Sequence, residues 1–258
     1  MTVDYELHGH VAVLTINRPN ARNAVNTDVA QGLEAGIDRL EEDPDAWVGI
    51  ITGAQTEKGW IFCAASYLKH ISVDPGGMTT KKGGFAGFVQ RERTKPVIAA
   101  VDGPALAGGT EIVLACDLVV ASETAVFGIP EVKRNLVAGA GGLFRLPRKI
   151  PRNIAMELAL TGRLDFPAER AYHYGLGNRL CAEGAALQTA MELADEITKA
   201  APLAVRESRS IILAATDQPD EVGWKLSGEG MMKMFSTEDF GEGLTAFIEK
   251  RDPVWKGR

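Results

Sequence analysis

Cysteine and histidine are scarce in this sequence of 258 residues. The three cysteines, Cys63, Cys116 and Cys181, lie far apart and form no Cys-x-x-Cys pair. We therefore expect reduced core thiols rather than disulfides or a zinc site. The four histidines form no His-Glu-x-x-His motif or other ligand spacing, so the sequence predicts no metal site.

An excess of basic residues and long apolar runs are also absent. Lys and Arg total 28 against 34 Asp and Glu, for a formal net charge of -6. This balance argues against nucleic acid as a partner, because binding a phosphate backbone usually requires a basic face. No apolar run reaches the ~20 residues of a membrane span, and the first residues lack the pattern of a signal peptide. We expect a cytoplasmic protein with no membrane partner.

The composition, 45% hydrophobic and 24% charged, is that of an ordinary globular protein. Strand and helix patterns alternate along its first half, as β-branched apolar runs give way to apolar residues at helical spacing. The expected order is a strand at 10–16, a helix at 27–41 capped by Asn26 or Thr27, strands at 47–52 and 97–101, a helix at 108–116 and a strand at 118–121. This alternation predicts an α/β core.

Two other stretches differ from that pattern. Residues 75–84 are rich in glycine and lysine and lack periodicity, which predicts a mobile loop of the kind that often covers a site. Beyond residue 151 the strand signals fade, and amphipathic helices are expected at 183–200, 202–215, 221–235 and 238–250.

The most suggestive local pattern is a buried strand followed by Gly108 and Gly109, which open an apolar helix. The first N–H groups of a helix have no internal partner and lie at the positive end of its dipole, so they can bind a ligand oxygen. Glycine lets that ligand approach the backbone closely.

Two carboxylates accompany this helix start. Glu111 follows one turn later among apolar residues, where partial burial would raise its pKa and suit it to proton transfer near neutral pH. Glu131 follows Pro130 at the end of an apolar strand, a common position for site residues. Taken singly, Glu111 could instead only favour the helix dipole, and Glu131 could be an ordinary surface residue.

The glycine-rich stretch 139–143 lacks the third glycine of a dinucleotide-binding fingerprint, since Phe144 occupies its place. We interpret it as the start of a helix that packs closely on a neighbour.

Four segments, in this order and spacing, resemble the enoyl-CoA hydratase/isomerase family, also called the crotonases, along nearly the whole chain. They are 17–24 (NRPNARNA), 62–69 (FCAASYLK), 105–117 (ALAGGTEIVLACD) and 127–142 (FGIPEVKRNLVAGAGG). They resemble the family's early coenzyme A segment, its F-C-A-G-A-D-L-K segment, its A-x-G-G-G-x-E helix and its F-G-x-P-E…G-A-G-G segment. Residues 127–131 and 142–147 look like the carnitinyl-CoA dehydratase branch.

The resemblance implies an α/β crotonase fold, which is a spiral of ββα units followed by helices that join subunits. We place the core at 1–195 and the C-terminal helical region, which covers coenzyme A and contacts other subunits, at 196–258. The implied assembly is a homotrimer or a dimer of trimers.

The resemblance also implies a site. The thioester carbonyl would be bound by the N–H groups of Ser66 and Gly108, and one such donor contributes roughly 10² to 10³ in rate. Glu111 and Glu131 match the two glutamates that hold the reacting water in the hydratases, and each such acid–base role contributes roughly 10² to 10⁴. The implied reaction is hydration of a 2-enoyl-CoA or the reverse dehydration, with coenzyme A as part of the substrate and no permanently bound cofactor.

Further positions match the family's segments that bind substrate and coenzyme A. They are Ala21, Arg22, Ala24, Ala64, Ala65, Tyr67, Leu68, Lys69, Gly109, Pro130, Gly139, Phe247 and Lys250. Phe247 would stack on the adenine and Lys250 would pair with phosphate, often across a subunit boundary. The alternative for this last pair is an amphipathic helix with solvated charges.

The chain departs from the family pattern at 65–67, where Ala65, Ser66 and Tyr67 replace glycine, alanine and aspartate. Alanine at a position of positive φ would cost roughly 1 to 2 kcal/mol. Other chemistry on an acyl-CoA therefore stays an alternative, namely double-bond isomerisation, decarboxylation or carbon–carbon cleavage, as does an acyl-CoA binding protein without activity. The second glutamate counts against isomerisation, because the isomerases typically use one acid.

Overall fold

The computed structural model describes residues 2–64 and 76–258. Within them, a mixed sheet of six strands runs in the order β1-β2-β3-β7-β9-β12, and all its neighbouring pairs are parallel except β1 and β2. The strands are β1 (Val3–His8), β2 (Val11–Ile16), β3 (Val48–Gly53), β7 (Val97–Val101), β9 (Leu118–Ser122) and β12 (Arg179–Cys181). The expected α/β architecture is confirmed.

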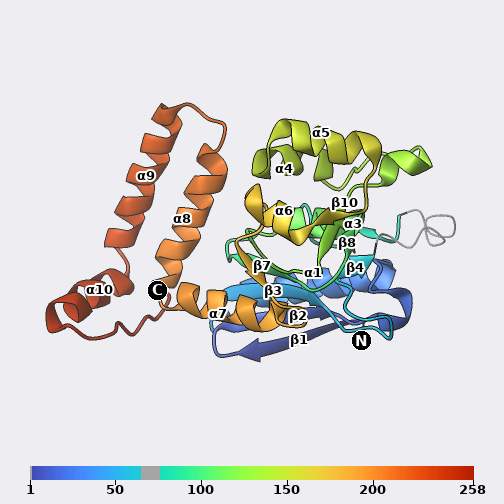
Figure 1. Cartoon of the computed structure of the whole chain (residues 1–258). Coiled ribbons are helices and arrows are strands. Elements are labelled where there is room, and N and C mark those ends of the chain that lie inside the picture. The colour runs from blue at the N-terminus through green and yellow to red at the C-terminus, as the bar shows by residue number, and fades with distance from the viewer. Residues whose placement is uncertain (1, 65–75) are drawn as a thin grey trace.

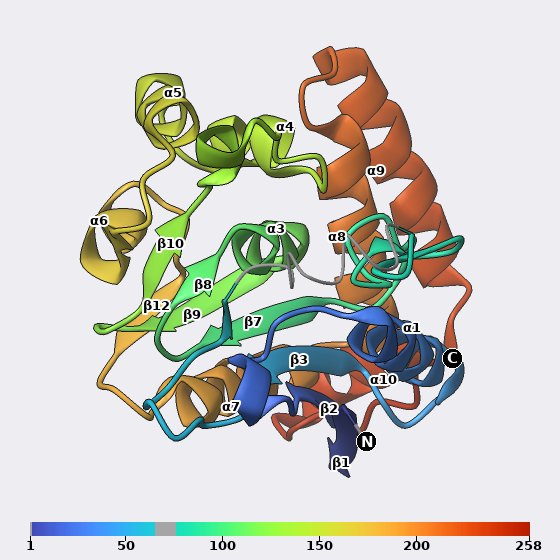
Figure 2. The same ribbon diagram turned by 90° about the vertical axis from the view of Figure 1, so that its right-hand side faces the viewer.

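Helices cover both faces of this sheet. Successive residues of a strand point to opposite faces, so each central strand contributes side chains to both layers. On β7, Ala99 joins the cluster that contains residues of α1 (Thr27–Glu42) and α3 (Gly108–Ala115). Its neighbours Ile98 and Ala100 join the cluster beneath α7 (Ala186–Thr198). Figure 2 shows α3 and α7 on opposite sides of β7 and β9.

A second, smaller sheet brings separate chain segments to one edge. It has the order β11-β10-β8-β4 and comprises β4 (Cys63–Ala64), β8 (Ala105–Leu106), β10 (Val126–Gly128) and β11 (Phe166–Pro167). Strand β8 runs parallel to β10, with Leu106 opposite Gly128. The chain therefore leaves β8 for α3 and leaves β10 for Glu131 at the same edge.

The remaining elements surround these sheets. A short antiparallel pair is formed by β5 (Thr79–Thr80) and β6 (Gly84–Phe85). The short helices are η1 (Pro19–Ala21), η2 (Glu131–Arg134), α4 (Gly142–Lys149), α5 (Arg152–Thr161) and α6 (Ala168–His173). The last three helices are α8 (Pro202–Ala215), α9 (Asp220–Phe235) and α10 (Glu238–Glu249). In Figure 1, α8 and α9 form a pair that stands apart from the helices α4, α5 and α6.

Most predicted elements agree with the structure to within a few residues, and the Asn26 side chain caps α1 by accepting the N–H of Val29. Several short elements were not predicted, among them β11, α5 and α6. The stretch 75–84 contains β5 and the start of β6, which are too short to give a periodic pattern. Strand β1 was missed although its sequence VDYELH alternates apolar and polar residues, a pattern typical of a strand with one exposed face. Strand β12 was missed because it has only three residues.

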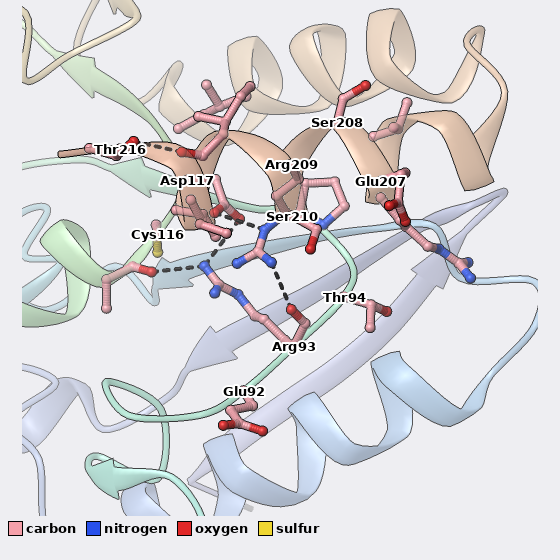
Figure 3. A pocket seen from close by; sticks show the side chains of 18 of the residues that line it. Glu92, Arg93, Thr94, Cys116, Asp117, Glu207, Ser208, Arg209, Ser210 and Thr216 are labelled. Atoms are coloured by element: carbon pink, nitrogen blue, oxygen red, sulfur yellow. Dashed lines mark hydrogen bonds and ion pairs between the residues drawn. The ribbon is translucent and has the colours of Figure 1, made fainter. Parts of the chain in front are cut away.

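Arg209 of α8 is anchored to the core by hydrogen bonds to Asp117 and to Arg93 O. The carboxylate of Asp117 accepts Arg209 Nε at 2.9 Å and Arg93 Nη2 at 3.1 Å. All three side chains are largely buried, and Figure 3 shows them together among the residues that line a groove of about 1430 Å³. Neither Glu111 nor Glu131 lines this groove, which is a space between α8 and the core.

In the described part of the chain, no helix combines the length and the apolar character needed to cross a bilayer.

Removing the Asp117 carboxylate should destabilise the fold, because two largely buried guanidinium groups would lose their counter-charge. We expect Asp117→Ala to lower the free energy of unfolding by about 3 kcal/mol or more. The control is Lys225→Ala, which removes an exposed pair with Glu229 at 4.0 Å and should cost less than about 0.5 kcal/mol. Urea unfolding of both variants measures the difference, and equal losses would contradict the assigned role.

Candidate active site

The start of α3 exposes backbone donors next to the edge of the small sheet. The first α-helical hydrogen bond runs from Glu111 N to Ala107 O at 3.1 Å, so the N–H groups of Gly108, Gly109 and Thr110 have no partner within the helix. Ala107 caps the helix with φ 52° and ψ −123°, a conformation that L residues rarely adopt. Its own N–H donates to Gly128 O at 2.8 Å.

Glycine is required at the first two helical positions by close packing. A Cβ added to Gly108 would lie 2.4 Å from the Phe85 ring, and one added to Gly109 would lie 2.3 Å from Cys63 O. The helix start is therefore pressed between β6 on one side and β4 on the other.

Glu111 is buried, with 4% of its surface exposed, which confirms the expectation of burial. Its Oε1 atom accepts two backbone N–H groups, from Ala140 at 2.8 Å and from Gly142 at 2.9 Å. Because both bonds are made to one oxygen, Oε2 is not needed to hold the side chain. The tight turn 140–142 at the start of α4 thus fixes the carboxylate from outside its own helix.

Glu131 opens η2, one residue past Pro130. Its Oε2 atom is buried and has no hydrogen-bond partner. A buried carboxylate oxygen without a partner carries a desolvation penalty that a bound water or substrate hydroxyl would relieve.

The two carboxylates interact electrically. The pKa of Glu111 is raised to about 7, because burial and, to a smaller extent, the charge of Glu131 outweigh the lowering effect of the two N–H donors and Arg145. Burial also raises the pKa of Glu131. A pair of acids with raised pKa values can exchange protons with a substrate near neutral pH.

The segment 17–24 reaches the same region. Asn23 is fully buried, and its Nδ2 donates to Ala54 O at 2.8 Å and to Ile61 O at 2.7 Å. Ala64 N donates to Arg22 O at 3.1 Å, and β4 pairs with β8 just before α3. Arg22 and Ala64 therefore lie beside each other, close in the fold to the start of α3.

The structure does not bring every predicted residue together. Gly109, Pro130 and Gly139 belong to the segments around the two glutamates. Ala21 and Ala24 flank Arg22. Ala65, Ser66, Tyr67, Leu68 and Lys69 lie outside the described residues. Phe247, 85% exposed, and Lys250 lie at the end of α10, which Figure 1 places below α9 and away from α3.

Two polar residues of this region were not singled out from the sequence. Thr110 Oγ1 lies 2.6 Å from Ala105 O and accepts Gly128 N at 3.1 Å, which joins α3 to β8 and β10. Arg145 Nη1 donates to Ala140 O at 3.2 Å and so contacts the turn 140–142. The sequence could have indicated a specific partner for Arg145, because a cation one turn into a helix is otherwise unfavourable to the helix dipole.

The family model for enoyl-CoA hydratase/isomerase matches residues 6–258. Enoyl-CoA hydratase EchA19 of Mycobacterium tuberculosis is 40% identical, covering 98% of this chain and 96% of its own length. A carnitinyl-CoA dehydratase of Salmonella heidelberg is 37% identical, covering 97% of each chain. The crystal structure of an enoyl-CoA hydratase from Mycobacterium tuberculosis superposes with a TM-score of 0.94 at 45% identity, covering 100% of this chain and 99% of the other. The expected crotonase fold is confirmed.

The raised pKa of Glu111 makes stability depend on pH. Protonated Glu111 contributes to the free energy of unfolding. This contribution is fully present below the ordinary pKa of 4.5 and is lost as the pH rises to about 7, because the carboxyl group ionises more easily in the unfolded chain. We expect Glu111→Gln, which cannot ionise, to gain stability relative to the wild type by roughly 3 kcal/mol across this range. Urea unfolding at several pH values measures the gain, and a constant difference would contradict it.

The conformation of Ala107 stores strain, which glycine would relieve. Strain at a positive φ costs about 1 to 3 kcal/mol, whereas glycine loses about 0.4 to 1 kcal/mol through the unfolded state. We expect Ala107→Gly to raise the free energy of unfolding by about 1 kcal/mol. The control Ala115→Gly lies in the same helix at an ordinary position and should lose about 0.5 to 1 kcal/mol. Equal losses in thermal unfolding would refute the strain.

Proposed function

Because the chain belongs to the enoyl-CoA hydratase/isomerase family, we propose that it is a hydro-lyase that adds water across the double bond of a 2-enoyl-CoA thioester or removes it from the 3-hydroxyacyl-CoA product. Relatives carry the names of both directions, enoyl-CoA hydratase and carnitinyl-CoA dehydratase. No metal or permanently bound cofactor is needed for this proposal, since the water is activated by carboxylates.

The main support for this proposal is the pair of carboxylates beside the start of α3. Glu111 has a pKa of about 7, and Glu131 has a raised pKa and a buried oxygen without a partner. Two acids of this kind can hold one water between them, and a pKa near the working pH suits a group that both accepts and gives a proton.

In the proposed reaction, the water oxygen forms a bond to the β-carbon while one glutamate takes a proton from that water. The electrons of the double bond move toward the thioester, whose carbonyl oxygen becomes negative. A proton then reaches the α-carbon from a glutamate, and the enzyme returns to its starting protonation state. Dehydration follows the same steps backwards.

The negative oxygen would be stabilised by the N–H of Gly108, which the helix leaves without an internal partner, aided by the positive end of the α3 dipole. We assign the second donor to Ser66 on the family resemblance. The donors match an oxygen that gains charge in the transition state, which is the condition for accelerating the chemical step.

Coenzyme A would run past Arg22 and Ala64, which a backbone hydrogen bond joins. Phe247 and Lys250 lie at the end of α10, which Figure 1 shows away from α3, so we assign them to a neighbouring copy's coenzyme A. This assignment fits a homotrimer or dimer of trimers in which residues 196–258 form the subunit contacts and 1–195 the catalytic core.

Loss of the conjugated-thioester absorbance of crotonyl-CoA tests the proposed reaction. We expect rapid loss with the wild type and a fall of roughly 10² to 10⁴ for Glu111→Ala and for Glu131→Ala. The matched control is Glu123→Ala, an exposed acid just after β9, which should keep the wild-type rate.

Two outcomes would contradict the hydro-lyase proposal. In the first, the wild type binds coenzyme A but turns over neither short nor long enoyl-CoA thioesters. In the second, it turns them over and either glutamate can be removed without effect.

A further inference from the structure

Arg145 occupies an unusual position for a cation. It lies at the end of the first turn of α4, where a positive charge is unfavourable to the helix dipole. Its side chain is half-buried, and burial lowers the pKa of its guanidinium. A cation kept there against both effects must be held by specific contacts.

Those contacts are two backbone carbonyl groups on different segments. Arg145 Nη1 donates to Ala140 O at 3.2 Å, and Nη2 donates to Val89 O at 2.5 Å. The planar guanidinium can reach two acceptors in fixed directions, which an ammonium group cannot do equally well.

The first contact leads directly to Glu111. Ala140, whose carbonyl accepts from Arg145, donates its own N–H to Glu111 Oε1 at 2.8 Å. Two residues on, Gly142 donates the other N–H. Between them, Gly141 has φ 108°, and a Cβ there would lie 2.2 Å from Arg145 Nη1. The guanidinium therefore packs against the turn that holds the carboxylate.

The second contact leads to the other half of the site. Val89 lies four residues after Phe85 in the sequence, and its N–H donates to Phe85 O at 3.2 Å. The Phe85 ring packs against Gly108, which is the proposed donor to the thioester oxygen. Arg145 thus ties the turn behind Glu111 to the segment that packs on Gly108.

We propose that Arg145 is a positioning residue for the hydration reaction. By fixing the carbonyl groups of Ala140 and Val89, it sets the direction of the Glu111 carboxylate relative to the N–H of Gly108. This inference rests on the proposed function. Arg145 itself need not touch the substrate.

The charged groups that act on Glu111 are few among the described residues. Glu131 on η2 raises its pKa and Arg145 on α4 lowers it. Strand β8 brings no titratable side chain, and β4 brings only the Cys63 thiol, which stays neutral because burial raises its pKa to about 12. Replacing Arg145 with a neutral residue should therefore move the Glu111 titration to higher pH.

Two substitutions separate position from charge. We expect Arg145→Gln to lower kcat on an enoyl-CoA by about 10- to 100-fold with KM changed less than about twofold, since misplacing a reacting group by about 1 Å costs rate on this scale. The limb of the kcat–pH profile that belongs to Glu111 should move to higher pH. Arg145→Lys keeps the charge, so it should lose kcat while the limb stays nearer its wild-type position.

The matched control is Arg148→Gln. Arg148 lies on the same helix with an exposed side chain, and its Nε is 3.4 Å from Asp217. This variant should keep the wild-type kcat and pH profile. Thermal unfolding of all variants shows whether a loss of kcat exceeds the loss of folded protein.

A second readout does not depend on turnover. The amide resonances of Ala140 and Gly142 should follow the ionisation of Glu111, with a midpoint at about pH 7 in the wild type and at higher pH in Arg145→Gln. If the wild type hydrates no thioester, the proposed reaction fails, yet this titration still decides the role of Arg145. The inference is overturned if Arg145→Gln keeps the wild-type midpoint, or if a folded Arg145→Gln enzyme keeps the wild-type kcat.

Discussion

Burying a carboxylate is unfavourable unless backbone donors or opposite charges compensate for the lost water. Glu111 meets this condition through two N–H groups from the turn 140–142, both bonded to one oxygen. The compensation is incomplete, because the pKa still rises to about 7. The two N–H donors fix the position of the Glu111 carboxylate, and the raised pKa lets it exchange a proton near neutral pH. The proposed chemistry depends on both properties.

The fold supplies the partners of that carboxylate from separate parts of the chain. Parallel pairing of β8 with β10 ends both strands at one edge, so the helix that carries Glu111 and the turn that carries Glu131 begin side by side. Thr110 reinforces the junction by bonding to the backbone of both strands. Glycine at 108 and 109 allows β6 and β4 to press against the helix start. Each feature brings the donors and acids closer than sequence distance suggests.

Much of this was predictable from sequence because it depends on local patterns. The glycine pair before an apolar helix predicts exposed backbone donors, and Glu111 within that helix predicts burial. The strands at 97–101 and 118–121 were evident because buried parallel strands are continuous apolar runs. The helix start at 139–143 was recognised, but its role as the donor of N–H groups to Glu111 was not, since that contact joins residues about thirty positions apart and depends on tertiary packing.

What sequence could not supply is the set of contacts between segments. Nothing local distinguishes Arg145 from an ordinary surface cation except its position near a helix start, and its two carbonyl partners come from a loop before α3 and a turn after it. The position of α10, below α9 and away from α3, follows from the direction in which α8 and α9 leave the core. Alternation of apolar residues cannot encode that direction.

We infer that Glu111 and Glu131 form an electrically coupled pair of acids with raised pKa values. It is tested most directly by following the side-chain carboxyl carbons of ¹³C-labelled glutamate by NMR as the pH changes. We expect a Glu111 resonance with a midpoint at about pH 7 that moves lower when Glu131 is replaced by glutamine, and a Glu131 midpoint above the ordinary glutamate value. Midpoints at about 4.5 for both groups, or a Glu111 midpoint indifferent to Glu131, would contradict it.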